Sequence, residues 1–174
     1  MKAGTAQLRL GAALNPNVLS TVLGHVMDLC TARQASLLLL DEAEQPQELI
    51  HIGFPADDKS GPKPVALSAA EPPTITHVTG PWLAFLMPGL KAEEVRSFLA
   101  LPLEANKRLY GYLSLANLHS LTAWEQALLQ TFAADLGLIL DQAVLFQATQ
   151  RKLSKAAALT EISQAISAKL TQDD

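Results

Sequence analysis

The fold is decided by two apolar runs joined by a short turn: Arg96-Ser-Phe-Leu-Ala-Leu-Pro-Leu-Glu104, then Ala105-Asn-Lys107, then Arg108-Leu-Tyr-Gly-Tyr-Leu-Ser-Leu-Ala116. Runs of this length, bounded by turn residues, are typical of β-strands, and a short connection joins neighbouring antiparallel strands. The stretch therefore predicts a β-hairpin. Pro102 has no backbone N–H to donate to a neighbouring strand, so we expect it at a bulge or at a free edge of the sheet.

Alternation along the second run predicts which of its side chains share a face. Successive side chains of a strand point to opposite sides of the sheet. Tyr110 and Tyr112 are therefore expected on one face together with Ser114, and Leu109 and Leu113 on the other.

A second hairpin and a helix are predicted before this stretch. Residues 35–41 and 48–53 are short apolar runs separated by a turn around Pro46. A helix from Pro16 to about Arg33 precedes them, because apolar residues recur there every three or four positions. The connection 54–79 contains five prolines, which exclude a long regular element, although residues 65–67 are compatible with a short edge strand.

The rest of the chain is predicted to be helical. Thr122 and Glu125 form a capping box, and no proline follows Pro102. One uninterrupted helix from residue 122 to residue 170 would be about 70 Å long, which exceeds what a small domain can pack. The apolar pattern slips within residues 154–158, which indicates either a stutter in a coiled coil or the start of another helix.

A heptad-like seam on this helix predicts contact with a second copy of the chain. The alternative is a single amphipathic helix that folds back on its own domain. The residues assigned to the dimer interface are Leu129, Phe132, Leu136, Ile139, Ala143, Phe146 and Leu153.

Composition excludes several classes of protein. Charged residues make up only 17% of the chain, against about 25% in typical soluble domains, which indicates a large core or a covered surface. A net charge of -4 argues against nucleic-acid binding, and a single cysteine excludes a disulfide framework. Because we find no membrane-spanning run and no secretory signal, we expect a soluble, cytoplasmic protein.

The order of these elements, with Leu101-Pro-Leu103, Gly111-Tyr-Leu-Ser-Leu115 and the helix start at residues 122–136, resembles a GAF domain over residues 16–146. The resemblance implies an α+β fold, a GAF/PAS-like antiparallel sheet of about five or six strands with flanking helices and a long C-terminal helix. A PAS domain is the alternative fold, and the opening helix from Pro16 argues against it.

The resemblance also implies a function without catalysis. Residues 1–150 would be a GAF-like sensor domain and residues 151–174 a C-terminal signalling helix. Such domains of two-component and related signalling proteins bind small molecules between the sheet and the connection. They act through paired helices on an output domain, here a histidine kinase, a cyclase or a further GAF domain in a longer parent chain. The alternative is a ligand-free structural module that only dimerises.

The ligand expected from this resemblance is unidentified. Cys30 lies in the first helix rather than in the connection, which disfavours covalent bilin, and isolated histidines disfavour haem and other metal sites. No motif indicates catalytic residues. The candidates for lining a pocket, each of which is also compatible with ordinary core or surface, are His77, Trp82, Phe85, Met87, Tyr110 and Tyr112.

Overall fold

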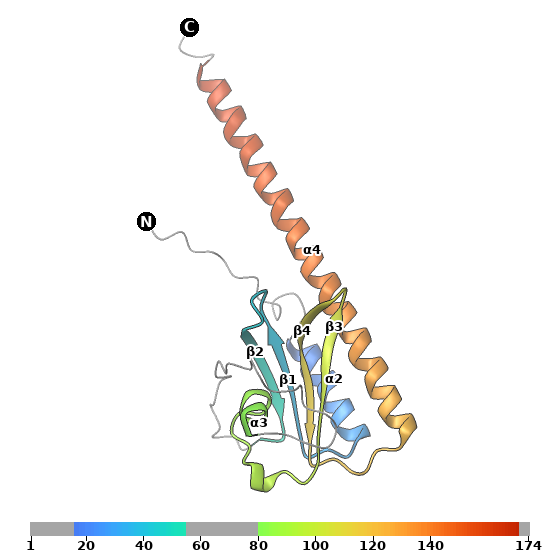
Figure 1. The fold of residues 1–174 in the computed structure, drawn as a ribbon. Coiled ribbons are helices and arrows are strands. Elements are labelled where there is room, and N and C mark those ends of the chain that lie inside the picture. Colours follow the sequence, from blue (N-terminus) through green and yellow to red (C-terminus); the bar gives the residue numbers. More distant parts are fainter. Residues whose placement is uncertain (1–15, 55–79, 171–174) are drawn as a thin grey trace.

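The computed structural model describes residues 16–54 and 80–170 (Figure 1). Their elements, in chain order, are α2 (Pro16–Leu29), β1 (Gln34–Leu40), β2 (Pro46–Ile52), α3 (Gly80–Leu86), the 3-10 turn η1 (Ala92–Glu94), β3 (Phe98–Ala105), β4 (Arg108–Ala116) and α4 (Ala123–Leu170). The predicted α+β class, both hairpins and both main helices are confirmed.

The strands form one antiparallel sheet in the order β2-β1-β4-β3. The described residues hold four strands, fewer than the expected five or six, and the candidate strand at residues 65–67 lies outside them. Pro102 lies in β3, which is an edge strand of the described sheet, as the missing N–H predicts.

Helices cover both faces of the sheet (Figure 1). Residues of α2 and α4 share one apolar cluster with one face, and residues of α3 share a second cluster with the other. The four consecutive leucines of β1 are all buried because this strand lies inside the sheet and has both faces covered.

A bulge in the β3–β4 hairpin changes the expected side-chain directions. Leu103 pairs with Gly111 but Glu104 pairs with Leu109, so Tyr110 is an extra residue in β4. Such a residue shifts the alternation on its strand. Tyr110 consequently packs on the α4 side and Tyr112 on the α3 side, and the prediction that the two tyrosines share a face is wrong.

The last helix, α4, is one uninterrupted element of 48 residues. Its predicted capping box is confirmed: the N–H of Thr122 donates to Glu125 Oε2 at 2.7 Å, and the N–H of Glu125 donates to Thr122 Oγ1 at 3.3 Å. The helix continues through residues 154–158 without a break. It packs on the sheet through its first half and then projects away from the domain, with residues 151–165 all exposed (Figure 1).

One stretch of α4 is long and apolar enough, by length and composition alone, to cross a membrane. The core helix of a soluble protein passes the same test. Here 39% of the apolar window is buried in the domain, including Leu136 and Leu140 against the sheet. Packing on the sheet therefore accounts for part of this hydrophobicity.

Candidate functional site

The α3 side of the sheet gathers four of the six residues that the sequence suggests for a ligand site. Trp82, Phe85 and Met87 are buried beside Tyr112, and the Trp82 ring lies 5.6 Å from the Tyr112 ring and 6.0 Å from the Phe85 ring. We call the buried set the α3 cluster; it contains Leu38, Leu40, Trp82, Leu83, Phe85, Leu86, Met87, Phe98, Ala100, Tyr112 and Ala116. His77 lies outside the described residues.

Two buried polar atoms on the α3 side have no hydrogen-bond partner within the described part of the chain. They are the indole Nε1 of Trp82 and the hydroxyl of Ser114. Buried polar atoms are nearly always paired, so each such atom calls for an explanation. Ser36, which is paired with Ser114 across β1 and β4, differs because its hydroxyl donates to the carbonyl of Leu86 at 2.6 Å.

The α3 cluster provides a neutral environment. The only charged side chain classed as buried in the described residues is Asp141, on the opposite side of the sheet. Burial, followed by the charges of Glu104 and Glu44, raises the pKa of Tyr112 above its usual value. Its hydroxyl therefore stays protonated at neutral pH, and the cluster offers hydrogen-bonding groups without charge.

The sixth candidate, Tyr110, belongs to a polar network on the α4 side. Its hydroxyl donates to Asp141 Oδ1, and Asn106 Nδ2 donates to Asp141 Oδ2 at 2.7 Å. The Arg108 guanidinium carbon lies 4.9 Å from the centre of the Tyr110 ring. Burial and the hydrogen bond to Asp141 raise the pKa of Tyr110 to about 12. Tyr110 therefore fixes α4 to the hairpin and does not line the α3 cluster.

Asp141 was not indicated by the sequence as a site residue. The sequence signal that could have pointed to Asp141 is its place inside an otherwise apolar helical stretch, where burying an unpaired carboxylate would be costly. Only the fold reveals that the β3–β4 hairpin supplies its partners, Asn106 from the turn and Tyr110 from β4.

The predicted dimer seam divides between two surfaces of α4. Leu129 and Leu136 are buried against the sheet of their own chain, so this part of the predicted interface is wrong. Phe132 and Ala143 are partly buried. The remaining three seam residues are exposed, and with their neighbours they form what we call the α4 stripe: Trp124, Leu128, Leu138, Ile139, Leu145, Phe146 and Leu153.

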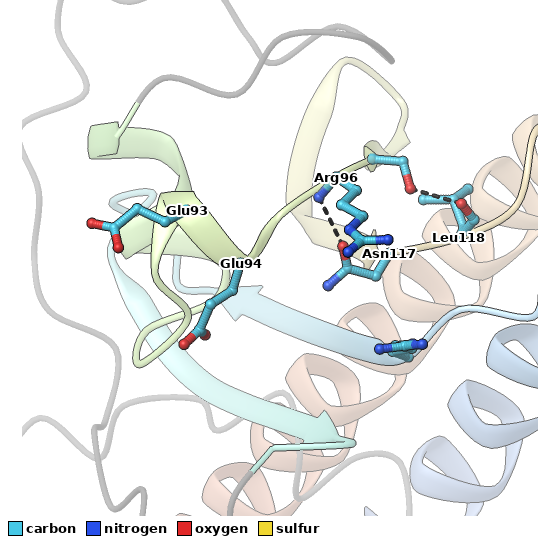
Figure 2. Close-up of a pocket in the computed structure, with 7 residues that line it drawn as sticks. Glu93, Glu94, Arg96, Asn117 and Leu118 are labelled. Atoms are coloured by element: carbon cyan, nitrogen blue, oxygen red, sulfur yellow. Dashed lines mark hydrogen bonds between the residues drawn. The ribbon is translucent and has the colours of Figure 1, made fainter.

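A polar pocket of about 340 Å³ lies where β1 and β3 begin and β4 ends (Figure 2). We call it the sheet-end pocket; its lining residues are Arg33, Glu93, Glu94, Arg96, Ser97, Asn117 and Leu118. The sequence did not indicate this pocket, because its residues come from three segments far apart in the chain: residue 33, residues 93–97 and residues 117–118. No group of His, Cys, Asp or Glu in the described residues is arranged to hold a metal ion.

Comparison with known protein families identifies the family of this chain. Residues 16–140 match the family described as GAF domain. The chain belongs to the GAF family. No curated protein matches the sequence.

Solved structures share the GAF fold of this chain at low sequence identity. The GAF domain of an Acinetobacter phosphoenolpyruvate-protein phosphotransferase has a TM-score of 0.57 at 19% identity, over 78% of this chain and 90% of that one. A domain assigned to a two-component sensor histidine kinase protein of Sinorhizobium meliloti has 0.58 at 17%, over 79% and 98%. The second GAF domain of DevS from Mycobacterium smegmatis has 0.52 at 20%, over 80% and 99%.

The GAF match ends inside α4. Residue 140 lies within the half of the helix that packs on the sheet, and the last buried residue in the stretch 123–165 is Val144. The GAF domain therefore includes the packed half of α4, and the projecting half extends beyond it.

Proposed function

We propose that this GAF domain is a non-catalytic sensory and regulatory module of a cytoplasmic signal-transduction protein. In this proposal residues 1–150 sense a small ligand, and residues 151–174 carry the response to an output domain such as a histidine kinase, a cyclase or a further GAF domain. The family membership and the structural similarity to domains of signalling proteins support a sensory and regulatory role. The observation that carries the proposal is the α4 stripe, which continues onto the projecting half of the helix.

A second copy of the same chain is the occupant that best fits the α4 stripe. Ile139, Phe146 and Leu153 are seven residues apart, which is the repeat of a coiled coil. These residues are 47%, 65% and 59% exposed, and burying the remaining surface of each would stabilise an assembly by about 1–2 kcal/mol. Another elongated helix can cover the stripe along its whole length, and α4 of a second copy has the same seven-residue repeat.

Sedimentation equilibrium tests this assembly. We expect the wild-type chain to be a dimer at micromolar concentration, and the double variant Ile139→Glu/Phe146→Glu to be a monomer, because two carboxylates per chain would be buried in the seam. The matched control is Gln130→Glu, which adds a carboxylate to an exposed position of α4 outside the stripe and is expected to leave the dimer intact. A monomeric wild type at high micromolar concentration would contradict the proposal.

The proposed ligand is a small neutral molecule with a hydrogen-bond acceptor, bound on the α3 side. The Trp82 indole can only donate, whereas the Ser114 hydroxyl can donate or accept, and neither has a partner in the described residues. Because the α3 cluster is apolar and holds no charged residue, a charged ligand would lose its hydration without compensation. Trp82, Phe85, Met87 and Tyr112 would contact the ligand, together with His77 in the connection.

Two serine variants test this ligand role. Ser36→Ala is expected to cost about 1–2 kcal/mol of stability, because the Leu86 carbonyl loses its partner, whereas Ser114→Ala is expected to cost nothing. In thermal-shift screening against metabolites, nucleotides and haem, a compound that stabilises the wild type should stabilise Ser114→Ala less. If no compound stabilises the wild type, the alternative of a ligand-free structural dimerisation module is favoured instead.

A further inference from the structure

The sheet-end pocket is formed by chain segments that the antiparallel sheet brings together. Arg33 immediately precedes β1, Arg96 and Ser97 precede β3, and Asn117 follows β4. Since β4 lies between β1 and β3 and runs antiparallel to both, the end of β4 lies beside the starts of β1 and β3, at the same end of the sheet. The turn η1 adds Glu93 and Glu94 (Figure 2).

The backbone around the pocket is held rigidly by Asn117. Its Oδ1 accepts a hydrogen bond from the N–H of Arg96 at 2.8 Å, and its Nδ2 donates to Gln34 Oε1 at 2.9 Å. Asn117 also has a φ of 55°, a left-handed conformation that asparagine tolerates better than most residues. The start of β1 and the start of β3 are thereby tied to the end of β4, so the pocket wall is preformed.

The charged groups of the pocket are balanced but not paired with one another. Two arginines and two glutamates line it, which gives a formal net charge of zero. Within the described ranges, neither Arg33 nor Arg96 forms an ion pair with Glu93 or Glu94; the ion pairs found there are Arg108–Glu42 and His119–Glu125. Figure 2 shows Arg96 beside Asn117, and Glu93 and Glu94 on the turn opposite them, with the Glu93 side chain extending away from Arg96.

We propose that the sheet-end pocket binds a small zwitterion, with its carboxylate at Arg33 and Arg96 and its ammonium group at Glu94. A guanidinium matches a carboxylate with two parallel hydrogen bonds, and a carboxylate accepts from an ammonium group. A simple anion would gain from the arginines but be repelled by the glutamates. The volume of about 340 Å³ lies at the lower end of the range for small-molecule sites and accommodates a free amino acid.

This site differs from the α3 cluster in chemistry and position, so either can fail without the other. It borders the segment that leads into α4: Leu118 lines the pocket, and its carbonyl accepts a hydrogen bond from the Ser97 hydroxyl at 2.7 Å. Next to it, His119 Nδ1 lies 2.6 Å from the carbonyl oxygen of Cys30. A ligand that contacts Asn117 and Leu118 would therefore act close to the start of α4.

NMR titration of the isotopically labelled chain with glycine, β-alanine and γ-aminobutyrate tests the proposal. These probes carry the same two charges at increasing separation. We expect saturable shifts at the side-chain resonances of Arg33, Arg96 and Asn117 for at least one of them. Propionate and propylamine, which carry one charge each, should bind more weakly.

The charge-neutralising variants Arg33→Gln, Arg96→Gln and Glu94→Gln should each weaken the binding of that probe about two- to fivefold, the loss expected for one solvent-exposed ion pair. All three side chains are exposed, so the fold should persist. The matched control is Lys91→Gln, an exposed lysine near the pocket but outside its lining, which should leave the affinity unchanged.

Three results would overturn the proposal. One is the absence of saturable shifts with every zwitterion. Another is propionate binding as tightly as the best zwitterion, which would show a plain anion site. The third is a loss of affinity in Lys91→Gln equal to that in Arg96→Gln, which would show attraction by net charge alone.

Discussion

Asp141→Ala is expected to lower the free energy of unfolding by about 2 kcal/mol, measured by urea denaturation. The substitution leaves the Tyr110 hydroxyl and the Asn106 amide without their acceptor. The Tyr110 hydroxyl is buried, and abandoning a buried group costs about 1–3 kcal/mol, whereas Asn106 is exposed and its amide can bond to water instead. The methyl group of alanine restores neither bond, so the helix loses its polar anchor on the sheet.

The control for this prediction is Asp135→Ala, which removes an exposed aspartate from the same helix. Its effect should lie within about 0.5 kcal/mol, as for surface substitutions in general. A double-mutant cycle with Tyr110→Phe should give a coupling of about 1 kcal/mol or more, since the two side chains share one hydrogen bond. Equal losses for Asp135→Ala and Asp141→Ala would contradict the role of the network.

Absorbance titration gives a second readout of this network. In a Tyr112→Phe background Tyr110 is the only tyrosine, and it should ionise near pH 12 rather than near its ordinary pKa of 10. Because the pKa of Tyr110 is raised in the folded state, the stability that the protonated Tyr110 contributes to the fold is fully present below about pH 10. It is lost as the pH rises through about 12. Asp141→Asn should lower the pKa of Tyr110, although burial keeps it above the ordinary value.

Gly137→Ala is expected to destabilise the domain by about 2–3 kcal/mol, although alanine is favoured over glycine in helices by about 1 kcal/mol. A Cβ atom at position 137 would lie 2.6 Å from the carbonyl oxygen of Glu104 and 2.8 Å from its nitrogen. Both atoms belong to the backbone of β3, which is paired with β4 and cannot simply move aside. Alanine would therefore displace α4 from the sheet.

Gly24→Ala in α2 is the matched control, because the same change there should have the opposite sign. The added Cβ would meet only Ile52 Cδ1, at 3.9 Å, which is an ordinary van der Waals contact. We expect a gain of about 0.5–1 kcal/mol from the reduced freedom of the unfolded chain. Urea denaturation of both variants checks the pair, and a stabilising Gly137→Ala would refute the close approach of α4 to β3.

The local elements of this protein could be predicted from its amino-acid sequence alone. The apolar run of β1, the turn at Asn106-Lys107, the helix start at Pro16 and the capping box at Thr122 each depend on a few neighbouring residues. Their order was sufficient to indicate the GAF fold. Such signals are legible because backbone preferences, capping and hydrophobic periodicity act over short distances along the chain.

The faces that these elements present to one another depend on how they pack in three dimensions. The bulge at Tyr110 reverses the side on which that residue packs, and it is defined by pairing with β3 rather than by the sequence of β4. The predicted seam of α4 is partly buried and partly exposed, because the helix is apolar on several sides. The close approach of Gly137 to the backbone of Glu104 fixes which side of the helix packs on the sheet. The partners of Asp141 and the sheet-end pocket join residues far apart in the chain, and distances between such residues are set by packing, not by local pattern.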